Sequence, residues 1–110
     1  MVEWIELNSQ DQLTEIKQKS STRAQIIFKH STRCSISSMA LNRLQRSEVP
    51  GDADFYLLDL IRFRNISNAI ATEFGVAHES PQVLVIKNGT CTYNESHMGI
   101  DMKGIQEQVA

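Results

Sequence analysis

The sequence predicts an α/β fold of three layers, α/β/α, with a mixed central sheet. Two observations carry this prediction. Short apolar segments typical of buried strands alternate along the chain with segments whose apolar residues recur every three or four positions, as in helices. Asn88 and Gly89 then separate the last two predicted strands, and this dipeptide is a strong signal for an antiparallel hairpin. Because helices between the early strands favour parallel pairing, the sheet should contain both strand directions.

The first half of the chain supplies two strands and two helices. A strand is expected over residues 2–7, followed by a helix to about residue 19 that Ser9 and Gln12 open as a capping box. The apolar run within residues 25–29 predicts a buried strand. One face of a second helix is predicted by the spacing of four apolar residues, Ile36, Met39, Ala40 and Leu44.

The second half continues the alternation after the break at Pro50 and Gly51. It predicts a strand over 55–60, a helix over 66–74 that ends at Gly75, a strand over 83–86, a strand over 90–95 and a last helix over 102–109. This is the element order of a thioredoxin-like fold, and residues 1–110 are expected to form one domain.

Composition narrows the function class. The net charge is -2 and gives no reason to expect a nucleic-acid partner. No apolar run approaches the roughly 18 residues of a membrane span, and the acidic N-terminus does not resemble a signal peptide. Two cysteines are too few for a disulfide scaffold. We therefore expect a cytoplasmic protein with reduced thiols and no membrane partner.

Cys34 is the first candidate for chemistry, because it lies between a predicted buried strand and the start of an amphipathic helix. Unpaired amides at a helix N-terminus stabilise an anion, and cysteines there ionise more readily than free cysteine. Residues 16–47 contain seven of the eleven Lys and Arg residues and none of the thirteen acidic residues. We expect this segment to form a positive face that favours the thiolate and attracts an anionic thiol or disulfide.

Ser37 stands three residues after Cys34, where a dithiol motif has its second cysteine. A hydroxyl there can donate a hydrogen bond to a thiolate one turn away, but it cannot form a disulfide. The pattern therefore predicts monothiol chemistry, in which a second thiol from solution resolves the mixed disulfide. Cys91 follows the hairpin turn at the far end of the sheet, roughly 15 Å away, and is expected to be a small buried residue on the Tyr93 face.

The histidines and Pro81 complete the candidate site. His97 ends the returning strand and either faces Cys34 or caps its loop, whereas His30 is expected to be structural and His78 to lie in a loop. Thioredoxin-like proteins place a cis-proline at the start of the third buried strand, opposite the cysteine. Pro81 occupies that position, and the backbone of Ser80 before it would pair with a bound thiol or peptide.

Four segments together, residues 28–37, 78–82, 87–89 and 96–97, resemble the monothiol bacilliredoxin family, the YtxJ-type general stress proteins. The resemblance runs from about Trp4 to the C-terminus. It implies a thiol-disulfide oxidoreductase that takes bacillithiol from thiolated proteins, with bacillithiol as co-substrate and no resident cofactor or metal. Cys34 would attack, and Arg33, Ser35, Ser80, Pro81 and His97 would contact the substrate. Ser35 departs from the proline that many members have at this position.

Other function classes remain as alternatives. A non-catalytic thioredoxin-like stress-response module would use Cys34 as a redox sensor. A phosphatase-type loop needs arginine six residues after the cysteine, where this chain has Ala40. The cysteines and histidines show no metal-ligand spacing, and the Cys-Gly-Phe-Ser motif of cluster-binding monothiol glutaredoxins is absent.

Overall fold

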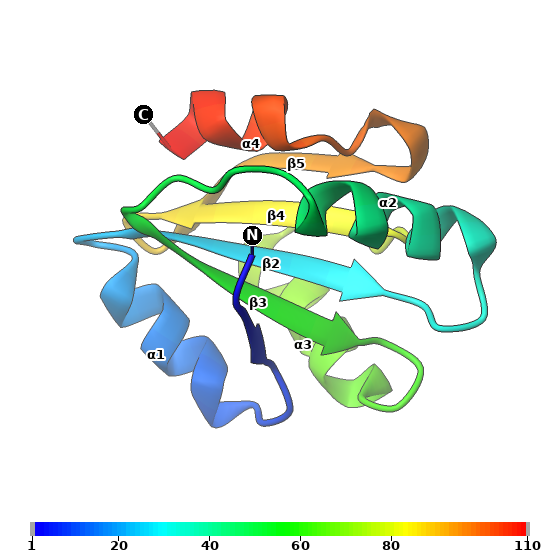
Figure 1. Ribbon diagram of the computed structural model, residues 1–110. Coiled ribbons are helices and arrows are strands. Elements are labelled where there is room, and N and C mark those ends of the chain that lie inside the picture. Colours follow the sequence, from blue (N-terminus) through cyan, green and yellow to red (C-terminus); the bar gives the residue numbers. More distant parts are fainter. Residues whose placement is uncertain (1, 110) are drawn as a thin grey trace.

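The computed structural model describes residues 2–109 and contains a five-stranded mixed sheet between two layers of helices (Figure 1). The elements in chain order are β1 Trp4–Glu6, α1 Asp11–Lys19, β2 Ala24–His30, α2 Ser35–Gln45, β3 Ala53–Asp59, α3 Arg64–Phe74, β4 Gln82–Lys87, β5 Thr90–Ser96, the 3-10 helix η1 His97–Gly99, and α4 Met102–Val109. Each predicted strand and helix is present, with ends that coincide or differ by one or two residues.

The sheet order is β1-β3-β2-β4-β5. Strands β1, β3 and β2 are parallel, β4 runs antiparallel to β2, and β5 runs antiparallel to β4. The prediction of parallel early strands and an antiparallel final hairpin is confirmed. At the hairpin turn Asn88 and Gly89 both have positive φ values, 53° and 78°, as a primed two-residue turn requires.

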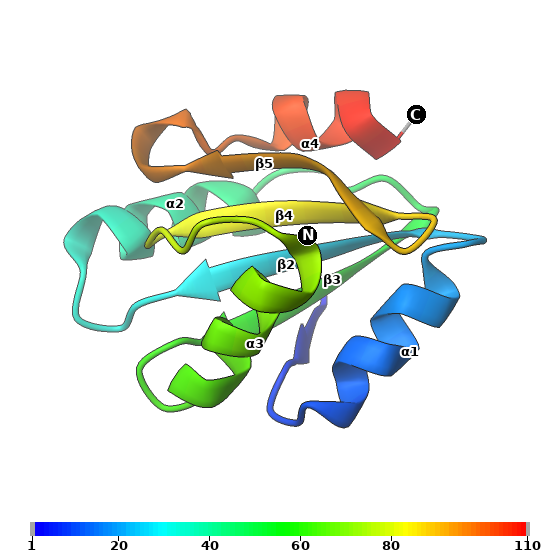
Figure 2. The ribbon, with the colours of Figure 1, turned by 180° about the vertical axis from the view of Figure 1, so that it is seen from behind.

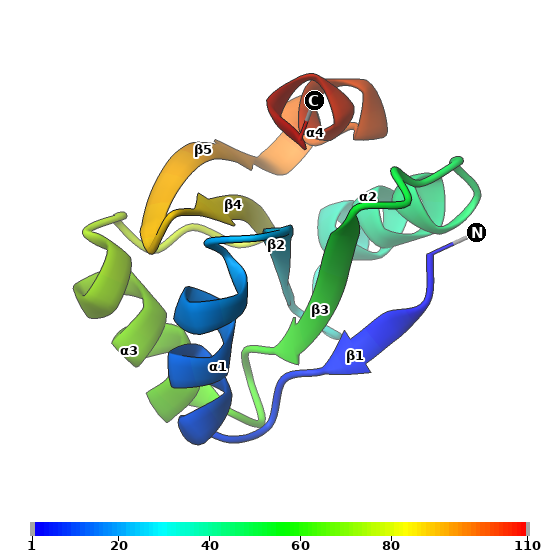
Figure 3. The same cartoon turned by 90° about the vertical axis from the view of Figure 1, so that its left-hand side faces the viewer.

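The two faces of the sheet bury separate cores (Figure 3). Helices α2 and α4 cover one face, where Phe28 and Val85 of the sheet meet Leu44 and Ile105. Helices α1 and α3 cover the other face. Most of the apolar side chains in both cores are fully excluded from water, and each contributes about 1.5–3 kcal/mol to folding. The three-layer α/β/α prediction is confirmed.

Local signals fix the ends of two helices. The side chain of Gln12 accepts a hydrogen bond from the backbone N–H of Ser9 at 3.0 Å, which is one half of the predicted capping box. The hydroxyl of Ser9 accepts from the amide of Asp11 instead of supplying the other half. Gly75 ends α3 in the left-handed conformation, with φ of 64°, as predicted.

Two packing predictions are wrong. In α2 the buried residues are Ser37, Ala40 and Leu44, whereas Ile36 and Met39 are 39% and 56% exposed. The buried stripe therefore starts at the serine, one residue later than the apolar pattern suggests.

The face assigned to Cys91 is the second wrong prediction. Cys91 is half-buried on the α1 and α3 side of the sheet, whereas Tyr93 packs on the α2 and α4 side. The pairing of β4 with β5 shifts by one residue between Val85, whose partner is Tyr93, and Ile86, whose partner is Cys91. A bulge of this kind adds one residue to a strand and reverses the alternation of side chains.

Candidate active site

Cys34 is the N-cap residue of α2 and is partly exposed. Its backbone is extended, with φ of -113° and ψ of 120°, and its carbonyl accepts the first hydrogen bond of the helix from the amide of Ser38 at 3.1 Å. The first amides of a helix have no partners within it and point toward the N-cap, so they form an electropositive site beside the sulfur. The predicted placement of Cys34 at a helix start is confirmed.

Strand register brings the Pro81 segment to the same end of the sheet. Lys29 of β2 pairs with Gln82 of β4, so the residues that follow β2 lie beside those that precede β4. Figure 2 shows the chain crossing from α3 to the start of β4 at the end where α2 begins. The Ser80–Pro81 peptide bond is cis, as the resemblance implies. The structure therefore groups Arg33, Cys34 and Ser35 with the backbone of Ser80 and Pro81 at one end of the sheet.

His97 fastens this segment from the other side. Its backbone N–H donates to the carbonyl of Pro81 at 3.0 Å, and its Nε2 lies 3.4 Å from Oε1 of Glu79. The residue has a φ of 56°, an uncommon conformation for a side chain other than glycine or asparagine. Because η1 packs against α2, His97 lies on the Cys34 side of the molecule and binds the Pro81 segment. Its hydrogen bond and ion pair go to Pro81 and Glu79, so contact with Cys34 and capping of the Cys34 loop both stay predictions.

Ser37 has a different role from the one its spacing predicts. It is fully buried, and its Oγ lies 2.6 Å from Nδ1 of His30 and accepts the backbone N–H of Ser31 at 3.0 Å. No hydrogen bond joins Ser37 to Cys34 among residues 2–109. The hydroxyl therefore holds the loop between β2 and Cys34. Burial lowers the pKa of His30, partly opposed by Asp59, which favours the neutral ring.

The predicted positive face is also wrong, because the sheet separates the seven cationic residues. Lys17 on α1 pairs with Glu73 on α3 at 2.8 Å, and Arg23 pairs with Asp54 at 3.1 Å near the far end of the sheet. Lys29 is fully buried. Arg33 is exposed directly beside Cys34 and is the cation that the prediction places correctly.

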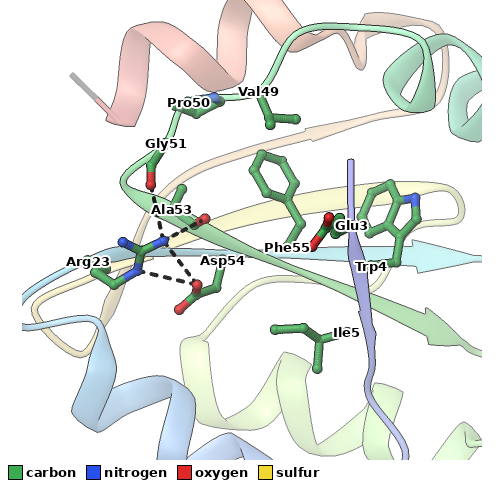
Figure 4. Close-up of a pocket in the computed structure, with 10 residues that line it drawn as sticks. All are labelled: Glu3, Trp4, Ile5, Arg23, Val49, Pro50, Gly51, Ala53, Asp54 and Phe55. Atoms are coloured by element: carbon green, nitrogen blue, oxygen red, sulfur yellow. Dashed lines mark hydrogen bonds and ion pairs between the residues drawn. The ribbon is translucent and has the colours of Figure 1, made fainter. Parts of the chain in front are cut away.

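A cavity of about 490 Å³ lies away from Cys34, at the amino ends of β2 and β3 (Figure 4). Figure 4 shows the guanidinium of Arg23 bonded to Asp54 and to the carbonyls of Gly51 and Ala53. Its charge is thus paired with Asp54, and Nε and one of its two terminal nitrogens donate within the protein. A second cavity, of about 300 Å³, touches the Cys34 loop at Thr32 and is lined by Trp4, Glu6, His30, Leu57 and Asp59.

Sequence reasoning missed Lys29 beneath the site, whereas the structural role predicted for His30 is confirmed. Both residues are buried at the end of β2, where an apolar strand pattern ends in two polar residues. That change of pattern was the available signal. Within residues 2–109 no three His, Cys, Asp or Glu side chains gather as metal ligands would. In the same range no helix combines the length and apolar character needed to cross a membrane.

The fold and the isolated cysteine at a helix start define a protein of the thioredoxin fold. Solved structures agree: one, provisionally described as an oxidoreductase with a thioredoxin fold, is 30% identical, covers 94% of this chain and 90% of its own, and has a TM-score of 0.77. Thioredoxins from Malassezia sympodialis (20% identity, 99% and 90% coverage, TM-score 0.73) and Fasciola hepatica (15% identity, 94% of each chain, TM-score 0.70) share the fold.

A model of the family "Monothiol bacilliredoxin BrxC" matches residues 5–105. The chain therefore belongs to the monothiol bacilliredoxin family, as the resemblance indicated. Family and fold together support a thiol oxidoreductase role. The phosphatase-type alternative has no such support.

Proposed function

We propose that this protein is a monothiol thiol-disulfide oxidoreductase that removes bacillithiol from mixed disulfides on protein cysteines in the cytoplasm. One observation carries the proposal: Cys34 is partly exposed at the N-cap of α2, and the residue one turn later is a buried serine. The electropositive start of α2 lies beside the attacking sulfur, and the absence of a second thiol in the motif makes an external thiol necessary.

The first step transfers bacillithiol, the thiol carrier, from the substrate protein to Cys34. The thiolate of Cys34 attacks the bacillithiol sulfur of the mixed disulfide, a new Cys34–bacillithiol disulfide forms, and the substrate cysteine leaves as a thiolate that takes a proton from water. In the second step another bacillithiol thiolate attacks the carrier sulfur. Bacillithiol disulfide leaves, the thiolate of Cys34 is restored, and no resident cofactor or metal takes part.

Five residues are proposed to form the substrate-binding site. Arg33 would attract an anionic thiol, and the amide of Ser35 would contribute to the electropositive site at the start of α2. The backbone of Ser80 and Pro81 would pair with the bound disulfide. His97 supports these two residues through the carbonyl of Pro81.

Exposed apolar side chains beside the cysteine favour a protein as the thiolated partner. Ile36 and Met39 lie on the first turns of α2 and are 39% and 56% exposed, and Met98 of η1, which packs against α2, is 66% exposed. Flexible methionines are common at surfaces that accept many different partners. These residues therefore suit transient contact with varied thiolated proteins.

Mass spectrometry after treatment with oxidised bacillithiol or oxidised glutathione tests the carrier and the nucleophile. We expect one bacillithiol adduct on Cys34, little glutathione adduct, and release of bacillithiol from a thiolated protein in repeated cycles. Cys34→Ser should lose turnover, whereas Cys91→Ser should retain it, since burial raises the pKa of the Cys91 thiol. An adduct that excess bacillithiol does not release would overturn the proposal in favour of a redox sensor.

A further inference from the structure

Residues 76–81 form the segment that delivers Ser80 and Pro81 to the site. The segment leaves α3 after Gly75, crosses the end of the sheet and enters β4 at Gln82 (Figure 2). Ala77, His78 and Glu79 within it are exposed, so packing against the core does not fix their position. Val76 packs against the core and Pro81 is buried, so polar contacts are needed to position the three exposed residues between them.

Two buried polar side chains of the sheet make these contacts from below. Lys29 is fully buried and Gln82, its partner across β2 and β4, is 1% exposed. The Nε2 of Gln82 donates to the carbonyl of Ala77 at 3.0 Å. The Nζ of Lys29 lies 3.3 Å from Nδ1 of His78 and 3.3 Å from the carbonyl of Ser67 in α3. The two side chains thus hold consecutive residues of the segment.

The protonation states suit a bond from Lys29 to His78. Burial lowers the pKa of Lys29 to about 8, so the amine is mostly charged at neutral pH. Burial, with Lys29 and Arg64 nearby, lowers the pKa of His78, against the opposing effect of Glu79. A neutral imidazole with its proton on Nε2 accepts at Nδ1 from an ammonium group that has no acidic partner among residues 2–109. The hydroxyl of Ser67 in α3 lies at the same 3.3 Å from this nitrogen.

Stability alone does not explain an amine at this place. A buried ammonium without a counter-ion loses hydration that two hydrogen bonds of 3.3 Å restore incompletely. Methionine would occupy a similar volume at the same position without that loss. A residue that opposes folding in this way points to a role in positioning the segment.

We propose that Lys29 is a positioning residue, which through His78 holds the 76–80 segment so that the Ser80 and Pro81 backbone meets a disulfide bound at Cys34. This inference rests on the proposed function. Lys29 does not touch the reacting sulfurs, because it lies beneath the sheet on the α3 side and Cys34 begins the helix on the opposite side.

The test separates docking from chemistry with Lys29→Met and His78→Ala, and with Lys87→Met as the matched control. Lys87 lies at the other end of β4 and bonds to the carbonyl of Gln108. Losing the hydrogen bond between Lys29 and His78, which both variants remove, should raise KM for a bacillithiol mixed disulfide about ten-fold. The rate of Cys34 alkylation by iodoacetamide should stay unchanged, and the Lys29 and His78 effects should not add in the double variant.

Backbone 15N order parameters give a readout that does not need turnover. Those of residues 76–80 should fall in Lys29→Met and His78→Ala and stay at the wild-type values in Lys87→Met. Unchanged order parameters or an unchanged KM would each overturn the positioning role. A fall in the rate of Cys34 alkylation by the same factor as the rise in KM would overturn it too. If the wild-type protein shows no turnover but the order parameters of the variants change as expected, the proposed function is rejected. The conclusion that Lys29 holds the segment through His78 is then retained.

Discussion

The Nδ1 of His30 lies 2.6 Å from the Oγ of Ser37, and this contact joins the end of β2 to the first turn of α2. The same oxygen accepts the amide of Ser31. The loop that carries Cys34 is therefore closed by one hydroxyl with two partners. His30 is held in turn by stacking on Phe28, with ring centroids 6.0 Å apart.

Ser37→Ala should destabilise the protein by about 1–3 kcal/mol, because it leaves the amide of Ser31 and a nitrogen of His30 without a partner in a buried place. Urea unfolding followed by circular dichroism measures the change. Ser38→Ala, on the next and less buried residue, is the control and should change stability by less than about 0.5 kcal/mol. Equal effects of the two variants would contradict the structural role of the hydroxyl.

Ser37→Cys should convert the chemistry from monothiol to dithiol. Residues three apart at the start of a helix lie close enough for a disulfide, whose Cα atoms need to be within about 7 Å. The new thiol should release bacillithiol from Cys34 without a second external thiol, and the oxidised variant should lose two mass units. Dependence on external thiol that stays as strong as in the wild type would show that the buried position prevents the attack.

His30 should make stability depend on acid pH. Its folded pKa is lowered, mainly by burial, so between the ordinary value of 6.5 and that lower value the unfolded chain binds the proton and the folded chain does not. Stability should fall as pH drops through this window. His78 contributes in the same direction, so the measurement is the difference between wild type and His30→Asn in the urea midpoint from pH 7 to pH 5. An identical loss in both proteins would contradict the role given to His30.

Local patterns were sufficient to predict the elements, the parallel and antiparallel pairings and the helix start at Cys34. Those features depend on neighbours in sequence: apolar period, turn residues and capping. The same reasoning could not place Cys91, because one extra residue in β5 reverses the alternation that assigned it to the Tyr93 face.

Long-range packing determined what the patterns missed in the site. The sheet passes between α1 and α2, so charges adjacent in sequence appear on opposite faces. Ile36 and Met39 fit a helical stripe equally well whether that stripe faces the core or a partner. Only the buried His30 beneath α2 shows why Ser37 turns inward instead.

Lys29 should make stability increase with alkaline pH. Its folded pKa of about 8 lies below the unfolded value of 10.5, so between these values the unfolded chain binds more protons and stability rises with pH. The slope from this residue is at most about 1.4 kcal/mol per pH unit. Lys29→Met should lack this contribution, and Lys87→Met should keep it.

The raised pKa values of Tyr56, Tyr93 and Cys91 act in the opposite direction at the top of this range. The quantity to measure is therefore the difference in unfolding free energy between wild type and Lys29→Met at pH 7.5, 8.5 and 9.5. The wild type should gain unfolding free energy relative to Lys29→Met as the pH rises. A constant difference would mean that the amine keeps its ordinary pKa in the folded protein.

Met39→Glu and Met98→Glu should distinguish protein substrates from small ones. Both side chains are more than half exposed, so a charge there should change stability by less than about 0.5 kcal/mol. An apolar contact with a thiolated protein would be lost, and KM for that protein should rise by about ten-fold in the double variant, which corresponds to about 1.4 kcal/mol of contact. KM for a bacillithiol mixed disulfide with a small thiol should stay the same, since it does not reach these residues. Lys103→Glu on the exposed side of α4 is the charge-matched control. A parallel rise in KM for both substrates would place Met39 and Met98 in thiol binding and leave the docking surface for proteins elsewhere.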